Sequence, residues 1–283
     1  MDPPRRPPAE PYGWWGYQWH APEPLSIVAL IAAGSLDART AALLWLALER
    51  RASLVVAAQA QHAGKTTTLT ALAEFLPPAT RRVYLRGWGE TFAFLGTADP
   101  GASYLLCNEI SAHLPVYLWG PRVARLFDAV ATGYGLGTTM HADNLDELSA
   151  TLEGPPLAVP RAAPAPSRVL GVARLDFLLV LAVDYVERRP RRRLHTLALL
   201  RRSGAGDDFD PATLVRWDTA RGDFVHAPDP PPPGLSRRAG LSAAMFVAER
   251  ERRAAYLGDL AARGVRAVHA VRRALAAYRP AGV

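Results

Sequence analysis

The stretch VVAAQAQHAGKTTTL, residues 55–69, decides the fold. Its first residues complete a short apolar run, Leu54–Ala58, which predicts a buried strand. The residues after Lys65 predict a helix that ends at Pro77-Pro78, because proline cannot continue a helix. Between them stands Gly64-Lys65-Thr66, the end of the G-x-x-x-x-G-K-[ST] pattern that turns backbone N–H groups toward phosphate oxygens. The stretch therefore predicts a phosphate-binding loop between a strand and a helix.

Gln59 replaces the first glycine of that pattern, so the pattern alone is a weak signal. The chain has 33 Lys and Arg residues in all, and Lys65 is the only lysine among them. An ammonium group reaches between two phosphates as a compact point charge, a role that a planar guanidinium fills poorly. The positive end of the helix dipole favours an anion at the same place. We therefore interpret the stretch as a P-loop whose glycine scaffold is partly lost.

Strands and helices alternate beyond this loop. Apolar runs predict strands at 82–86, 104–108 and 136–139, and helical spacing predicts helices at 122–131 and 145–152. Such alternation is typical of an α/β fold with a parallel sheet flanked by helices. We expect hairpin strands at 177–186 and 194–200 around an arginine-rich turn, 187–193, a second hairpin at 215–217 and 224–225, and helices from 242 to 278 with a break at Gly264.

Composition shifts suggest five segments. We expect a Pro- and aromatic-rich strap at 1–24, a P-loop core at 25–153, a Pro/Ala-rich linker at 154–167, a part with β-hairpins at 168–227, and a proline spacer with basic helices at 228–283.

Composition also narrows the function classes. The apolar runs are shorter than the roughly 18 residues of a membrane-spanning helix, and no signal peptide precedes them, so we expect a cytoplasmic protein. The single Cys107 forms no internal disulfide and reads as a buried thiol, and the sequence shows no Cys/His metal cluster. The net charge of +7 is carried by residues 235–283, where helical spacing favours a solvated basic face over a nucleic-acid or anionic membrane surface.

A second motif supports the P-loop. Residues 104–109, YLLCNE, form an apolar strand that ends in the carboxylate of Glu109. The carboxyl ends of parallel strands meet at one edge of the sheet, so Glu109 is expected beside the P-loop. There it could hold Mg²⁺ through water or polarise an attacking water molecule.

A third motif, ATGYGLGTTMHAD at residues 131–143, completes the pattern. The order GKTTTL, an apolar strand with NEI, ATGY and then TTMHA resembles the secretion ATPases of the type II, type IV and pilus-assembly group, in their tight-adherence and archaeal-like branch. The resemblance covers residues 24–278 and implies a RecA-like P-loop fold. It implies that ATP and Mg²⁺ are bound and that the chain forms a ring, typically a hexamer, on an inner-membrane platform at the cytoplasmic face.

The resemblance also implies residue roles. His62, Ala63, Gly64, Lys65, Thr66 and Thr67 would bind the nucleotide, and Thr66 and Glu109 would hold Mg²⁺, the latter through water. Lys65, Glu109 and His141 would be catalytic, with His141 sensing the γ-phosphate. An arginine in trans would come from Arg81, Arg82, Arg86 or Arg122.

The sequence departs from that family in several places. Only about 24 residues stand where the family has a closing N-terminal domain, and no aspartate box is recognisable, with Glu90 as a candidate substitute. Gln59 and Asn108 replace motif glycines. A non-glycine residue at positive φ costs ~1–2 kcal/mol, so two such positions would weaken nucleotide binding by about one to two orders of magnitude.

Two functions remain open. The retained lysine, threonine, glutamate and histidine favour a motor subunit that hydrolyses ATP for a pilus-assembly or secretion apparatus. The missing aspartate box and closing domain favour a pseudo-ATPase that acts as a regulatory or structural partner of an active paralogue. A nucleic-acid motor would rest only on the basic tail and on residues 188–193, which lack interleaved aromatic side chains, so we expect no nucleic-acid partner.

Overall fold

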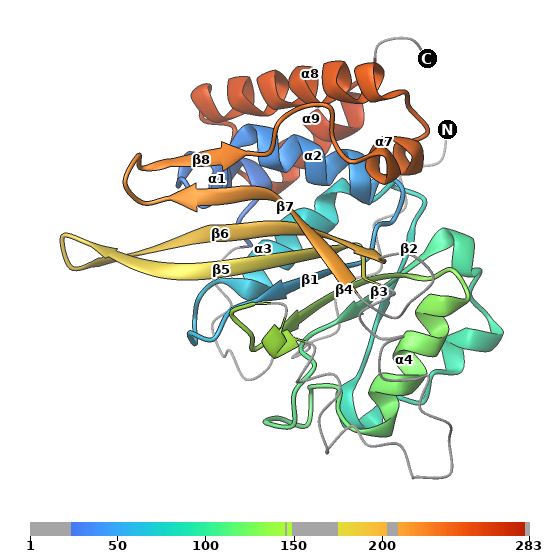
Figure 1. Cartoon of the computed structure of the whole chain (residues 1–283). Coiled ribbons are helices and arrows are strands. Elements are labelled where there is room, and N and C mark those ends of the chain that lie inside the picture. The colour runs from blue at the N-terminus through green and yellow to red at the C-terminus, as the bar shows by residue number, and fades with distance from the viewer. Residues whose placement is uncertain (1–23, 145, 149–174, 203–208, 281–283) are drawn as a thin grey trace.

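The computed structural model describes residues 24–144, 146–148, 175–202 and 209–280 (Figure 1). Most of the predicted strap, the linker at 154–167 and most of the predicted helix 145–152 lie outside this part. None of the described helices is long and apolar enough to span a membrane.

From β1 onward, apart from α7, the described elements follow the order that the sequence predicts. The helices are α1 Ile27–Ala32, α2 Ala38–Leu48, α3 Lys65–Leu72, α4 Pro121–Ala131, α7 Pro233–Ala239, α8 Ala243–Ala262 and α9 Val268–Ala277. The strands are β1 Leu54–Ala57, β2 Arg81–Tyr84, β3 Ser103–Cys107, β4 Gly135–Met140, β5 Phe177–Val186, β6 Arg189–Arg202, β7 Phe209–Asp218 and β8 Asp223–His226. Helix α7 was not predicted; Pro233 begins it, where the fixed φ of proline suits the first turn.

The eight strands of the described residues form one sheet in the order β2-β3-β4-β1-β5-β6-β7-β8. From β2 to β5 all neighbouring strands pair in parallel, and from β5 to β8 they pair antiparallel. The predicted fold class is therefore confirmed as α/β, with a parallel P-loop sheet, hairpins and C-terminal helices. The hairpins do not form a separate sheet but extend the parallel one.

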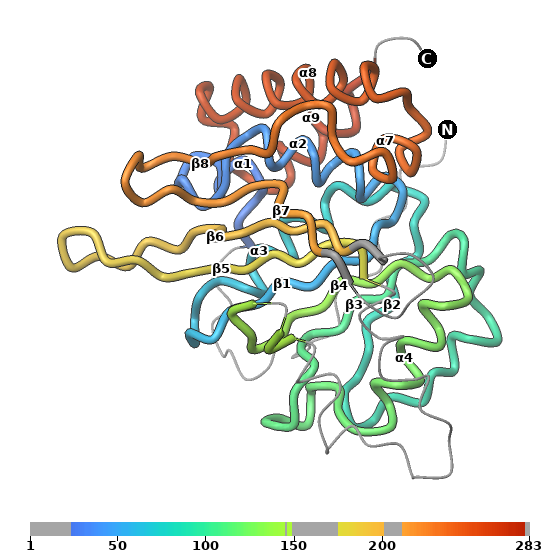
Figure 2. Tube along the Cα trace, in the orientation of Figure 1, coloured from blue at the N-terminus to red at the C-terminus, as the bar shows by residue number. Residues whose placement is uncertain are grey.

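Side chains of the central strand alternate between two cores. Leu54 and Val56 of β1 point into a core that also contains residues of α1, α2, α3 and α8. Val55 and Ala57 point the other way, into a core shared with α4. Figures 1 and 2 show the corresponding layers, with α2 and α8 on one side of the sheet and α4 on the other. Burial on both faces explains why β1 is a continuous apolar run.

Two arginines of the C-terminal helices are buried, although the sequence predicts that they lie on a solvated basic face. Helix α8 lies against α2, and Arg253 is only 2% exposed, with Nε donating to Glu249 Oε1 at 2.8 Å and its guanidinium 4.6 Å from the Trp45 ring. Arg250 is also buried and forms two hydrogen bonds with Asp229. The prediction of a solvated face is wrong for these two arginines, because carboxylates and an aromatic face compensate their burial.

The turn between β5 and β6 is shorter than predicted. It consists of Glu187 and Arg188, whose φ angles of 50° and 64° are left-handed, as the tight two-residue hairpin turns require. The predicted arginine-rich turn at 187–193 is therefore wrong from Arg189 onward, because these residues are part of β6. The usual Asn-Gly signature of such a turn is absent, which is why the sequence did not indicate it. One consequence is that Arg192 lies beside the P-loop.

Candidate functional site

A pocket of about 930 Å³ lies at the edge of the sheet where β1, β3 and β4 end. The loops that follow these strands carry the three predicted motifs, as expected for the carboxyl edge of a parallel sheet. Every predicted site residue lines the pocket: His62, Ala63, Gly64, Lys65, Thr66, Thr67, Glu109 and His141. The pocket is also lined by His113 and by Arg191–Arg193 of β6, which the sequence analysis did not assign to the site.

The backbone of the P-loop is strained at a different residue than expected. Gly64, which precedes α3, has a φ of 91°, and His62 is held at 58°. Gln59 and Asn108 are not among the residues with positive φ. The predicted penalty at those two replaced glycines is therefore wrong, and a single non-glycine residue, His62, takes the left-handed conformation.

Arg192 supports this strained segment. Its Nε donates to the His62 carbonyl at 2.6 Å, and a Cβ added to Gly64 would lie 3.4 Å from Arg192 Cδ. The charged strand β6 therefore lies directly over the loop that would hold a phosphate. Two of the arginines expected to act in trans have partners within the chain, because Arg81 donates to the Thr97 carbonyl and Arg82 to the Ala73 carbonyl.

We expect Arg192→Ala to weaken ATP binding about five- to tenfold, because it removes a charge-assisted hydrogen bond that orients the loop, worth roughly 1–1.5 kcal/mol. Isothermal titration with ATP and Mg²⁺ would measure the change. Arg189→Ala, on the same strand next to the turn, is the matched control and should bind ATP like the wild type. Unchanged affinity in Arg192→Ala would show that the loop needs no support from β6.

Lys65 is buried at the base of the pocket. Its Nζ lies 3.3 Å from the Ala58 carbonyl oxygen, 4.0 Å from Glu109 Oε2, and 3.4 and 3.5 Å from the two ring nitrogens of His141. Burial lowers the pKa of the Lys65 ammonium, and the Glu109 carboxylate offsets part of this effect. The only lysine of the chain therefore lies among the three motifs, at the position from which a phosphate can be neutralised.

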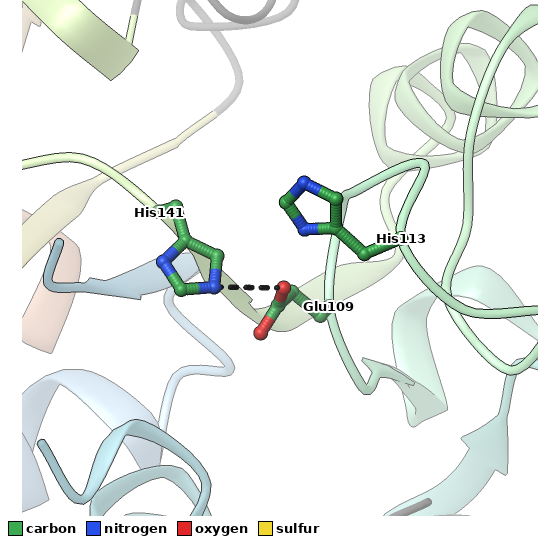
Figure 3. A group of neighbouring side chains, drawn as sticks. All are labelled: Glu109, His113 and His141. Atoms are coloured by element: carbon green, nitrogen blue, oxygen red, sulfur yellow. Dashed lines mark ion pairs between the residues drawn. The ribbon is translucent and has the colours of Figure 1, made fainter. Parts of the chain in front are cut away.

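Glu109 is 6% exposed, and one of its oxygens lacks a hydrogen-bond partner. That oxygen, Oε1, is 3.4 Å from His141 Nε2, close enough for an ion pair but not aligned for a hydrogen bond (Figure 3). Oε2 lies 3.5 Å from the Thr139 hydroxyl, whose shorter hydrogen bond, 2.7 Å, goes to the Asn108 carbonyl. A buried carboxylate with an unsatisfied oxygen indicates a site that is completed by a ligand.

His113 joins Glu109 and His141. Each of the three offers one ligand atom within 4.8 Å of the others, and the two imidazole rings meet edge to face with centroids 5.9 Å apart (Figure 3). The prediction of no Cys/His metal cluster did not consider carboxylates, and this group combines two histidines with Glu109. His113 stands in a loop four residues after Glu109, where the spacing carried no periodic signal, and only the fold brings it toward His141.

Glu90 does not act as a substitute for the aspartate box. Its carboxylate accepts hydrogen bonds from the backbone N–H groups of Arg86 at 2.9 Å and Phe92 at 2.6 Å, so it closes its own loop. It is not among the residues that line the pocket. Among the described residues that line it, Glu109 is the single carboxylate.

These residues fit a nucleotide with a divalent cation. Helix α3 begins at Lys65, among residues that line the pocket, and the N–H groups of a first helical turn have no partners within the helix. Lys65 supplies a positive charge, and Thr66 and Glu109 supply the oxygen atoms that Mg²⁺ prefers. The unpartnered Glu109 oxygen is the observation on which this fit depends.

No protein-family model matches the sequence. Two uncharacterized proteins of Methanocaldococcus jannaschii, MJ1287 and MJ0900, are each 29% identical to this chain, over 150 and 154 residues that make up 47% and 48% of it. The chain spans 55% and 28% of the lengths of these relatives. Among solved structures, it is similar to the VirB11 ATPase of the Brucella suis type IV secretion system in complex with sulphate, with 18% identity, a TM-score of 0.41 and coverage of 55% of this chain and 50% of that one. The function is therefore inferred from the site itself.

Proposed function

We propose that this chain binds ATP with Mg²⁺ at the P-loop edge of the sheet and hydrolyses it, as a motor subunit of a pilus-assembly or type II/IV-like secretion apparatus. One observation carries this proposal: the only lysine of the chain lies 4.0 Å from a buried carboxylate with an unpartnered oxygen, in the pocket that the P-loop borders. The order of the three sequence motifs supports it further.

Each residue of the site has a role in this reaction. Lys65 neutralises the β- and γ-phosphates, and the backbone N–H groups of residues 62–67 hold their oxygens. Glu109 orients the attacking water, and His141 contacts the γ-phosphate. Thr66, and Glu109 through water, would hold Mg²⁺, which would neutralise phosphate charge. Catalysis of this kind depends on positioning and charge, so a loop with one strained residue can support it.

The proposed surroundings follow from the motif resemblance. We propose a ring oligomer, of six subunits in the family that the motifs resemble, or an assembly with an active paralogue. It would act on an inner-membrane platform protein from the cytoplasmic side. Nucleic acid is not a proposed partner, because Arg250, Arg253 and Arg272 of the basic helices already pair with carboxylates.

A second function is favoured by a specific feature of the site. Glu109 is the only carboxylate among the described residues that line the pocket, so no second acid is available there to position Mg²⁺ and water. This favours a subunit that binds nucleotide without hydrolysing it and regulates an active paralogue. The two functions share the binding site and differ in turnover.

Lys65→Ala should weaken ATP binding about 10- to 100-fold, because a hydrogen bond to a charged group contributes roughly 1.5–3 kcal/mol. The wild type can be tested with an ATP acyl-phosphate probe, which transfers its acyl group to a lysine near the bound phosphates. Since Lys65 is the only lysine, a labelled lysine identifies the site by itself. Excess ATP with Mg²⁺ should prevent the labelling.

Arg221→Ala, in the exposed turn between β7 and β8, removes one positive charge from a residue that does not line the pocket and is the matched control. It should bind ATP like the wild type. If Lys65 is labelled equally with and without excess ATP, or if Lys65→Ala binds ATP as tightly as the wild type, the chain has no nucleotide site at this loop.

A further inference from the structure

We propose that Glu109, His113 and His141 bind a divalent transition-metal ion of the Zn²⁺ or Co²⁺ type, and that they do so without nucleotide. The three side chains come from the ends of two neighbouring parallel strands, β3 and β4, and from the loop after β3 (Figure 3). Their ligand atoms lie within 4.8 Å of one another. This site shares two residues with the proposed nucleotide site but does not depend on it.

The separation of the first two ligands suits a shared ion. His141 Nε2 and Glu109 Oε1 are 3.4 Å apart. Two ligands bound to a tetrahedral zinc at about 2.0–2.1 Å lie roughly 3.4 Å from each other. An ion could therefore be bound by this pair without moving either side chain far.

The hydrogen bonds around His141 create a place for a cation. His141 Nδ1 faces the Gln59 carbonyl oxygen at 3.3 Å, so an N–H on this nitrogen can donate to it. In the neutral ring, Nε2 then carries a lone pair and faces Glu109 Oε1, which has no hydrogen-bond partner. Lys65 Nζ lies 3.5 Å from Nε2, and a metal ion between Nε2 and Oε1 would be bound by both acceptors. A carbonyl that fixes the other nitrogen is the usual support of a metal-bound histidine.

The Lys65 ammonium lies beside two of the three ligands. Its Nζ is 3.4 and 3.5 Å from the two nitrogens of His141 and 4.0 Å from Glu109 Oε2, so it competes with a metal ion for the same lone pairs. A metal ion is repelled by this charge, but it would be bound by three ligands, Glu109, His113 and His141. The metal site should therefore bind more tightly when the ammonium is removed or when an anion neutralises it.

His113 supplies the third ligand and determines the kind of metal. The side chain is exposed at the pocket, and the Ser111 hydroxyl, 2.9 Å from its Nδ1, holds the ring. A metal at Nε2 would keep that contact, whereas one at Nδ1 would replace it. Two imidazoles and one carboxylate suit Zn²⁺, Co²⁺ or Fe²⁺, while Mg²⁺ prefers oxygen ligands alone. The open side of the pocket leaves room for water or a phosphate oxygen as a further ligand.

The test is a titration of the full chain with Co²⁺ in the absence of nucleotide, monitored by the visible absorption of the bound ion. Zn²⁺ is then added to displace the Co²⁺. We expect one site with the intense bands of low coordination. His113→Ala, a change at an exposed side chain, should weaken Co²⁺ binding at least about tenfold, in line with the loss of a metal-site contact. His269→Ala, an exposed histidine on α9, is the matched control and should bind Co²⁺ like the wild type.

Lys65→Ala separates this proposal from the proposed function. It should weaken ATP binding but strengthen Co²⁺ binding several-fold, because it removes a positive charge 4.0 Å from Glu109. Co²⁺ bound by a chain that does not bind ATP would support the metal site and reject the nucleotide site. ATP bound by a chain that takes up no Co²⁺, or Co²⁺ affinity unchanged by His113→Ala, would overturn the metal site alone.

Discussion

Glu109→Gln is expected to lower ATP turnover by about 10²–10⁴-fold, the usual effect of removing a positioned acid or base. Glu109 is the only carboxylate among the described residues of the pocket, so no neighbour can take its place. Glutamine keeps the shape of the side chain but not its charge. The measurement is phosphate release at saturating ATP and Mg²⁺, with the purified wild type and the variant compared side by side.

Glu109→Gln should leave ATP affinity unchanged or raise it, although it lowers turnover. The Glu109 carboxylate lies 4.0 Å from the Lys65 ammonium and would also face the phosphates, which it repels. Its neutralisation removes this repulsion, so Glu109→Gln should bind ATP as tightly as the wild type or a few-fold more tightly. ATP affinity and phosphate release are therefore measured separately, and we expect Glu109→Gln to lose the second while keeping the first.

Glu187→Gln, in the exposed β5–β6 turn, is the matched control for this change and should hydrolyse ATP like the wild type. Equal turnover in Glu109→Gln and the wild type would remove Glu109 from the reaction. ATP binding by the wild type without any phosphate release would instead identify the chain as a pseudo-ATPase, and the search would move to its active partner.

The sequence predicted the parts of the site that belong to short motifs. In a parallel sheet, the loops after β1, β3 and β4 must meet at one edge, so recognising three strand ends was enough to bring Lys65, Glu109 and His141 together. The side chains of β1 point into two cores, which made this strand visible as an apolar run.

The missing parts depend on contacts between distant segments. Arg192 contacts His62, 130 residues away, only because β6 is longer than its apolar pattern and begins directly after a two-residue turn. Charged residues at the start of β6 resemble a loop in sequence. His113 likewise approaches His141 through the packing of its loop, and the guanidinium of Arg253 lies over the ring of Trp45, which belongs to α2. No local pattern contains these partners.

Gly135→Ala should destabilise the fold by about 3 kcal/mol, at the upper end of the usual effect of overpacking. Gly135 of β4 pairs with Tyr104 of β3 in the sheet, and the Tyr104 ring lies across it. A Cβ at Gly135 would lie 2.6 Å from the Arg51 carbonyl oxygen and 2.6 Å from Cδ2 of Tyr104. The carbonyl is backbone and cannot turn aside, and the Tyr104 hydroxyl is held between the carbonyls of Ala52 and Leu136.

Gly137→Ala gives a graded comparison on the same strand. Its Cβ would meet Leu69 Cδ1 at 2.8 Å and the Tyr104 ring at 3.1 Å, and the leucine side chain can move. We therefore expect a loss of only about 1–2 kcal/mol. Gly96→Ala is the control, since nothing lies within 4 Å of a Cβ there. Thermal unfolding should rank the three variants. We expect Tm to fall by roughly 6–12 °C in Gly135→Ala, by a few degrees in Gly137→Ala and by no measurable amount in Gly96→Ala.

The order of the three variants is the decisive result. Because Gly135 begins β4 and His141 directly follows its last residue, Met140, an alanine at Gly135 should also displace β4 and weaken ATP and Co²⁺ binding together. If Gly135→Ala unfolds at the temperature of Gly96→Ala, β3 and β4 do not pair in the register that brings Tyr104 opposite Gly135. The edge that joins Glu109 to His141 would then have a different geometry, and both binding proposals would fall with it.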